Sequence, residues 1–151
     1  MQGTHVPNPT QQSAFVAQID ALGRPHDIRA LPLSGLRLVV ALRLCAQFER
    51  VGRDPLPELA QRFRSIEAAC AVHDLMVTVA ASWPEPFTFG RPCCLSLSPD
   101  EVTLAAMSRA ALHADHAGFS RSINGFVRQD RQEALYNSAL HAVALLSATH
   151  A

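Results

Sequence analysis

The chain has 151 residues, 48% of them hydrophobic, and its 13 basic residues are balanced by 13 acidic ones. This length gives enough apolar surface for one domain to fold without disulfides or metal. The zero formal net charge argues against a footprint for nucleic acid or anionic membrane. All 13 basic residues are arginine, which excludes Schiff-base and lysine–phosphate chemistry.

The sequence carries no targeting signal that we can identify. Residues 1–19 are uncharged, but Pro7 and Pro9 interrupt any apolar run, and a basic region is lacking. Later apolar stretches are too short or too polar to span a membrane. We therefore expect a soluble cytoplasmic protein without a membrane partner, whose four cysteines are thiols.

Helix-forming residues dominate the chain after a short leader. Residues 1–12 predict a flexible N-terminal arm, and residues 13–151 a helical domain. Alanine and leucine are abundant, and alternating β-branched runs are scarce, so the sequence predicts an all-α bundle of about five or six helices. Caps and turn residues place these helices over residues 13–22, 34–50, 55–83 and 98–116, then a short one after Gly118 and a last one capped by Asp130.

The helix over residues 55–83 is expected to be continuous and central. Its apolar residues recur at spacings of three and four, which predicts one stripe facing the core. The stripe consists of Leu59, Phe63, Ile66, Cys70, His73, Val77 and Ala80.

The clearest helix start is Ser98-Pro99-Asp100-Glu101, a capping box with proline at the first helical position. An irregular loop at residues 85–97 precedes it and is expected to pack over one end of the bundle. If a small molecule binds, we expect an apolar pocket with a few polar groups at this loop. Its lining would be Trp83, Phe87, Phe89, Arg91, Cys93 and Cys94.

The adjacent thiols of Cys93 and Cys94 allow a metal site. Thiolate and imidazole suit soft metals, and a structural zinc site needs four ligands. His113 and His116, three residues apart on the following helix, complete such a set for zinc or iron. However, adjacent cysteines depart from the usual ligand spacing, and thiols packed in loop backbone are the more common case. A disulfide between neighbours would close a strained, easily reduced ring, which leaves a redox role open.

A weaker pattern suggests nucleic-acid binding. Ala114 and Gly118 have the spacing of a helix-turn-helix, whose second helix would present Arg121, Asn124 and Arg128 to DNA. Gly125 would weaken that helix, and acids outnumber arginines from Ser98 onward. Two packed helices joined at the glycine account for the same pattern.

One arginine row suggests anion binding. Arg43, Gln47 and Arg50 share a helix face, and such a row binds carboxylate or phosphate or forms a solvated face of ion pairs. No nucleophile elbow, phosphate-binding glycine loop or dinucleotide fingerprint is present. The sequence therefore favours a non-enzymatic role without deciding the question, and predicts no catalytic residue.

The segment Arg91-Pro92-Cys93-Cys94, followed by Leu97-Ser98-Pro99-Asp100-Glu101 and preceded by Arg62-Phe63-Arg64, resembles a family of small uncharacterised bacterial proteins. In that family a Pro-Cys-Cys segment stands just before a capped helix. The resemblance covers about residues 32–148. It implies an all-helical small domain and no activity.

Three functional interpretations follow, in this order. The first is a non-enzymatic binding, adaptor or regulatory module that forms a homodimer through exposed apolar helix surface. The second is a thiol-based metal-binding or redox protein, and the third is a DNA-binding protein.

Overall fold

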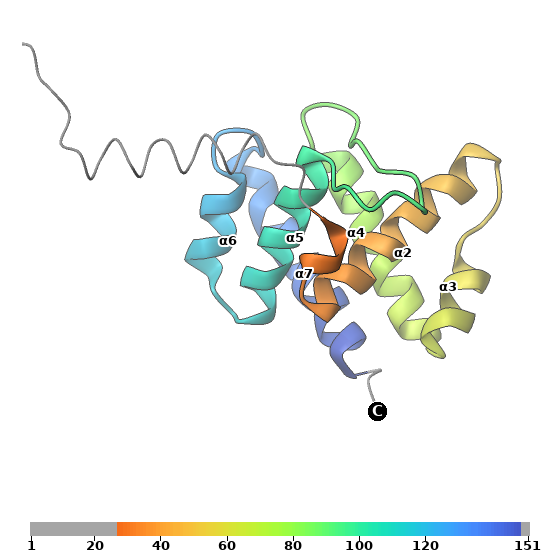
Figure 1. Ribbon diagram of the computed structural model, residues 1–151. Coiled ribbons are helices and arrows are strands. Elements are labelled where there is room, and N and C mark those ends of the chain that lie inside the picture. The colour runs from red at the N-terminus through yellow and green to blue at the C-terminus, as the bar shows by residue number, and fades with distance from the viewer. Residues whose placement is uncertain (1–26, 149–151) are drawn as a thin grey trace, which may run out of the picture.

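The computed structural model describes residues 27–148, which form six α-helices and one 3-10 turn. The predicted all-α bundle is confirmed (Figure 1). The elements are η1 (Ile28–Ala30), α2 (Leu33–Arg50), α3 (Leu56–Phe63), α4 (Ile66–Ser82), α5 (Pro99–Leu112), α6 (His116–Ile123) and α7 (Gln129–Ala148). The expected N-terminal arm and the expected helix over residues 13–22 lie outside the described residues.

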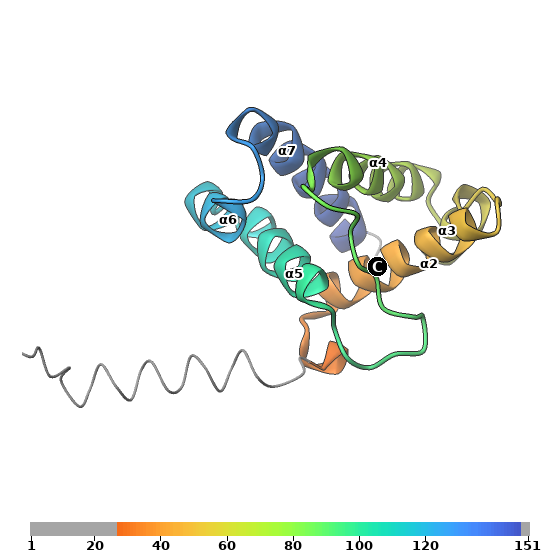
Figure 2. The same cartoon turned by 90° about the horizontal axis from the view of Figure 1, so that it is seen from above.

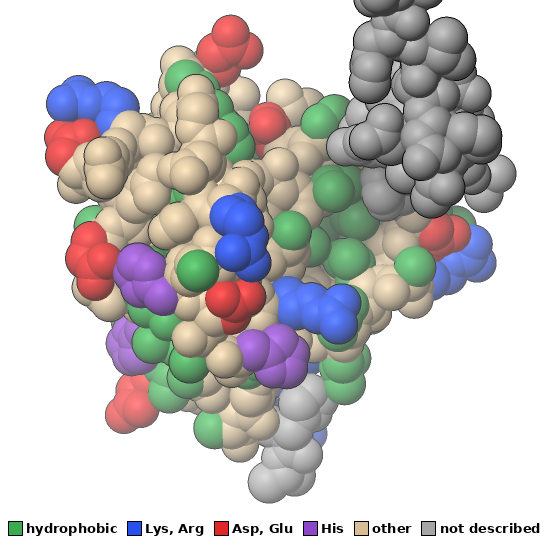
Figure 3. Space-filling view, turned by 90° about the vertical axis from the view of Figure 1, so that its left-hand side faces the viewer, with side chains coloured by type: hydrophobic (Ala, Val, Ile, Leu, Met, Phe, Trp, Pro, Cys, Tyr) green, Lys and Arg blue, Asp and Glu red, His purple; other side chains and the backbone are tan. Residues whose placement is uncertain are grey.

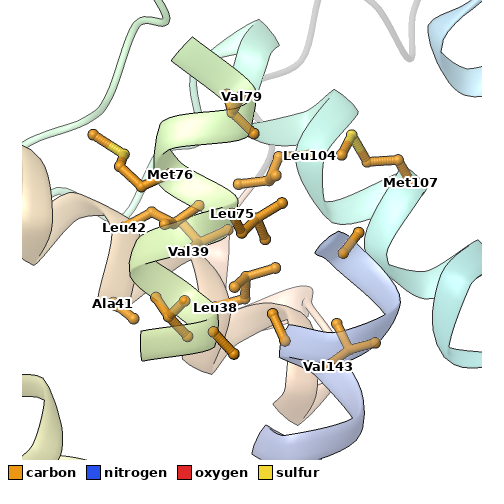
Figure 4. Close-up of a cluster of buried hydrophobic side chains, with 14 of the residues drawn as sticks. Leu38, Val39, Ala41, Leu42, Leu75, Met76, Val79, Leu104, Met107 and Val143 are labelled. Atoms are coloured by element: carbon orange, nitrogen blue, oxygen red, sulfur yellow. The ribbon is translucent and has the colours of Figure 1, made fainter. Parts of the chain in front are cut away.

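The core is formed where α2, α4, α5 and α7 meet, with the loop between α4 and α5 crossing one end (Figure 2). Apolar side chains from these four helices point toward one another (Figure 4). Burying one Leu or Val side chain stabilises the fold by about 1.5–3 kcal/mol. The inner face of α4 consists mainly of Ala68, Ala69, Ala71, Val72, Leu75, Met76 and Val79.

The predicted continuous helix over residues 55–83 is wrong. Arg64 adopts a left-handed conformation, with φ of 52°, and ends α3. Ser65 then caps α4, because its side chain accepts a hydrogen bond from the N–H of Ala68 at 3.1 Å. Residues 58–83 contain neither glycine nor proline, so Ser65 is the one cap residue there that marks the break.

This break also overturns the predicted apolar stripe. Leu59 and Phe63 on α3 are buried, as expected. The α4 members of the stripe instead lie on the outer face of that helix, where Ile66 is 71% exposed and Val77 is 54% exposed. A change of helix direction between residues 63 and 66 separates the two halves.

The end of α5 also differs from the sequence-based expectation. The helix ends at Leu112 and not near His116. Ala114 has a φ of 53°, and its N–H bonds the carbonyl of Ala111 while the N–H of Asp115 bonds that of Ala110. This is a Schellman motif with alanine where glycine is usual. Near the C-terminus, α7 begins at Gln129, so Asp130 lies in its first turn and is not its cap.

Candidate functional site

A buried ion pair organises the region of the two adjacent cysteines. Arg43 on α2 is 1% exposed, and Glu101 on α5 is fully buried. Nε of Arg43 donates to Oε2 of Glu101 at 2.6 Å, and Nη2 donates to Oε1 at 2.9 Å. A buried pair of this kind persists only when its remaining hydrogen-bonding groups are also satisfied.

Arg43 meets that requirement through the backbone of the α4–α5 loop. Nη1 donates to the carbonyls of Arg91 at 3.1 Å and Cys94 at 2.6 Å. Nη2 donates to the carbonyl of Ser96 at 3.0 Å. A guanidinium has five N–H donors, and all five are used. The loop is therefore held in place by its main chain, wrapped around one arginine.

Glu101 joins this arrangement to the start of α5. Its Oε1 accepts from the N–H of Ser98 at 2.9 Å, and its own N–H donates to the Ser98 hydroxyl at 3.1 Å. The predicted capping box is thus present. Burial acts to raise the pKa of Glu101, but hydrogen bonds from Arg43 and Ser98 outweigh it and lower that pKa. Glu101 is therefore a carboxylate in the folded protein.

The two cysteines differ in their surroundings. Cys94 is half-buried, with its Sγ 3.5 Å from the carbonyl of Ser96. Cys93 is exposed and lines a cleft of about 330 Å³ between α2 and the loop. The cleft is lined by Arg43, Ala46, Gln47, Arg50, Gly90, Arg91, Pro92 and Cys93. The arginine row predicted on α2 and the loop thiol are therefore parts of one surface feature.

The aromatic residues of the expected pocket lie in a different hollow. Trp83, Phe87 and Phe89 line a depression of about 510 Å³ together with Met76 and Ala80. The ring centroids of Trp83 and Phe87 are 5.0 Å apart, and those of Phe87 and Phe89 are 4.4 Å apart. The structure thus divides the expected lining between two sites, one aromatic beside α4 and one with Arg91 and Cys93 beside α2.

The four expected metal ligands are not brought together. Cys93 and Cys94 precede the first residue of α5, whereas His113 follows its last. The 14 residues of this helix span about 21 Å. His116 instead contacts Glu133, with Nε2 3.1 Å from Oε2. Within residues 27–148, no group of three His, Cys, Asp or Glu side chains is arranged to hold a metal ion.

The expected DNA-contacting residues do not share one helix. Arg121 is in the last turn of the eight-residue α6, Asn124 follows that helix, and Arg128 precedes α7. Arg128 is paired with Asp130 at 3.0 Å. On the side of the molecule where α6 lies, basic, acidic and histidine side chains are interspersed (Figure 3). The described surface there lacks the continuous basic stripe typical of DNA-binding domains.

Comparisons with protein families, with curated proteins and with solved structures find no match to this chain. In the described part of the chain, no helix is long and apolar enough to cross a bilayer.

Proposed function

We propose that this protein is a non-enzymatic interaction module that self-associates through the outer face of α4. The observation that carries the proposal is an uncharged row on that helix, here called the α4 stripe. It consists of Ile66, Cys70, His73, Val77 and Ala80. All but the half-buried His73 are exposed, although the row includes two large hydrophobic residues.

The spacing of the α4 stripe is that of a coiled-coil seam. Its intervals of four, three, four and three residues keep all five side chains on one helix face. Such a seam lowers its free energy by packing against a second apolar helix. The other apolar residues of α4, apart from the exposed Ala81, already face the core of their own bundle.

A second copy of the chain is the partner that fits this order of residues. In an antiparallel pair with a two-fold axis at His73, Ile66 of one copy faces Ala80 of the other. Cys70 likewise faces Val77. These two pairs each join a larger side chain to a smaller one, and His73 faces its own copy on the axis.

The aromatic hollow extends this contact. It begins at Ala80 and continues to Trp83 and Phe87 at the C-terminal end of α4. In the antiparallel arrangement, the exposed side chain of Ile66 from the second copy lies over this end. An aromatic depression next to a protruding aliphatic side chain is typical of an interface anchor.

The charges beside the stripe give the dimer a distinct salt dependence. Asp74 and Glu67 are exposed along one border of α4. A two-fold axis at His73 places this border against itself, with the two copies of Asp74 nearest the axis. Salt screens that repulsion, so we expect dimerisation to strengthen with ionic strength.

Sedimentation velocity over a range of protein concentrations tests the proposal. The wild-type chain should dimerise, and Val77→Glu should be monomeric because it places a charge in the seam. Val51→Glu is the matched control, since Val51 is 66% exposed but lies at the end of α2. A monomeric wild type, or a dimer unaffected by Val77→Glu, would show that the proposal is wrong.

Disulfide trapping tests the register. Val77→Cys places a thiol opposite Cys70 of the second copy, whereas seven residues along one helix are about 10.5 Å and too far for an internal bridge. Mild oxidation at low concentration should give a covalent dimer linked between positions 70 and 77. Linkage only between like positions would contradict the antiparallel register.

A further inference from the structure

The cleft beside Cys93 has two uncompensated positive charges. Arg50 and Arg91 line it, and neither side chain has an ion-pair partner within residues 27–148. The third arginine, Arg43, is neutralised by Glu101. No aspartate or glutamate is among the lining residues. The cleft is therefore suited to an anion.

Glu49, the acidic residue next to Arg50 in the sequence, does not line the positively charged cleft. Glu49 follows Cys45 by one helical turn, so the two residues share a face of α2 that is turned away from Arg43 and Gln47. The pKa of Cys45 is raised to about 12, mainly by burial and further by Glu49. Glu49 is accordingly not among the residues that line the cleft.

The dimensions and donors of the cleft indicate what kind of anion it fits. Its volume of about 330 Å³ is at the lower end of the range for small-molecule sites. Arginine side chains form two-point hydrogen bonds with carboxylates, and Gln47 adds an amide donor and acceptor. A small molecule bearing one or two carboxylates satisfies these groups.

Cys93 adds thiol chemistry to this anion site. We infer that the cleft binds small disulfides that carry carboxylate groups and that Cys93 forms a mixed disulfide with them. The cleft and the α4 stripe lie on different helices. The control thiol used below, Cys70, belongs to the stripe, so the rates are measured at protein concentrations at which the chain is monomeric.

The reaction is a thiol–disulfide exchange. The Cys93 thiol loses its proton, and its sulfur attacks one sulfur of the bound disulfide. The bond between the two ligand sulfurs breaks as the bond to Sγ forms. The released half takes up a proton and leaves as a thiol, so one thiol and one disulfide are consumed and one of each is produced.

The chain contains its own control thiol. Cys70 is exposed, as Cys93 is, but it lies on α4 between the acidic residues Glu67 and Asp74. Anionic reagents are thus attracted to Cys93 and repelled from Cys70, while cationic reagents experience the reverse. Because both thiols are exposed, the ratio of the modification rates of Cys93 and Cys70 reports how the charge of the reagent is recognised and not how accessible the thiols are.

The experiment treats the full chain separately with oxidised glutathione, which is anionic, and with cystamine, which is cationic. Peptide mass spectrometry then gives the rate at each cysteine. We expect the Cys93-to-Cys70 ratio to be at least ~10-fold higher with oxidised glutathione than with cystamine, and to fall as salt is added. Equal ratios with the two reagents would overturn the inference.

Two further measurements locate the effect in the cleft. Combining Arg50→Gln with Arg91→Gln should slow glutathionylation of Cys93 by ~10-fold and leave its reaction with cystamine no slower. Arg131→Gln on α7 is the matched control and should change neither rate. In the unmodified chain, S-methylglutathione cannot exchange and should protect Cys93 but not Cys70. Absence of that protection would contradict binding even if the double variant folded poorly.

Discussion

Gly90 lies so close to the guanidinium of Arg43 that a Cβ atom at position 90 would be 2.5 Å from Nη2 and 2.8 Å from Cζ. The guanidinium cannot move aside, because all five of its N–H groups are bonded to Glu101 and the loop carbonyls. We therefore predict that Gly90→Ala lowers the free energy of unfolding by about 1–3 kcal/mol, measured by urea denaturation.

Gly35→Ala is the matched control for that substitution. Gly35 is inside α2, and the nearest atom to a Cβ there is the Cβ of Leu31 at 4.0 Å, an ordinary contact. Alanine should therefore stabilise this helix by about 0.5–1 kcal/mol. If Gly90→Ala and Gly35→Ala change the free energy of unfolding equally, the close approach of Arg43 to position 90 does not explain the effect of Gly90→Ala.

Removing one member of the buried ion pair should be costly. Arg43→Met leaves the Glu101 carboxylate buried without its partner, and we expect a loss of about 3–5 kcal/mol in the free energy of unfolding. Arg62→Met is the control, since the Arg62–Glu58 pair spans one helical turn at the surface and contributes about 0–1 kcal/mol. Denaturant titration measures both, and a loss below 1 kcal/mol for Arg43→Met would contradict this assignment.

The same pair gives stability a defined pH dependence. The pKa of Glu101 is lowered on folding from a reference of 4.5. A lowered carboxyl pKa contributes stability that is present above the unfolded value and is lost as pH falls through the folded value. The difference in unfolding free energy between wild type and Glu101→Gln should therefore shrink as pH falls below about 4.5.

Asp27 is a second carboxyl group whose pKa is lowered, here to about 2. The main cause is its hydrogen bond with the Arg29 side chain, and the second is its hydrogen bond with the Arg29 backbone N–H. This contribution is present in both proteins and cancels in the difference. A difference between wild type and Glu101→Gln that stays constant from neutral pH to below the reference value would show that Glu101 is not held as a carboxylate.

Ala114→Gly should stabilise the protein. Ala114 occupies the left-handed position of the Schellman motif after α5, where a Cβ atom costs about 1 kcal/mol relative to glycine. We expect a gain of about 1 kcal/mol in thermal or urea unfolding. Ala105→Gly in the middle of α5 should lose a similar amount. The stability changes of Ala114→Gly and Ala105→Gly should have opposite signs. The gain at position 114 then cannot come from the conformational entropy that glycine adds to the unfolded chain, because both variants share that effect.

Features encoded by neighbouring residues could be predicted from the sequence. The capping box at Ser98 and Glu101 was correctly identified because both partners lie within one helical turn. The bundle itself followed from helix-forming composition and turn spacing. Composition does not predict the break at Arg64, since an arginine in a left-handed conformation leaves no signal in the sequence.

Features that depend on distant residues could not be predicted in the same way. Helical spacing places Arg43 on one face with Gln47 and Arg50, but its partner Glu101 is 58 residues away. An arginine between Leu42 and Leu44 in an apolar helix was the available sign of a buried role. The expected pocket is likewise divided by the path of the loop. Its aromatic residues lie beside α4, whereas Arg91 and Cys93 lie beside α2.

The attachment of the loop to Arg43 also determines when it can become ordered during folding. Its carbonyl partners at Arg91, Cys94 and Ser96 are 48, 51 and 53 residues from Arg43 along the chain. None of these bonds can form until α2 and the start of α5 have met, and closing loops of this length costs entropy that only the assembled core can offset. The Pro-Cys-Cys segment should therefore be among the last parts of the domain to order, and the geometry of its thiols is a property of the completed tertiary structure.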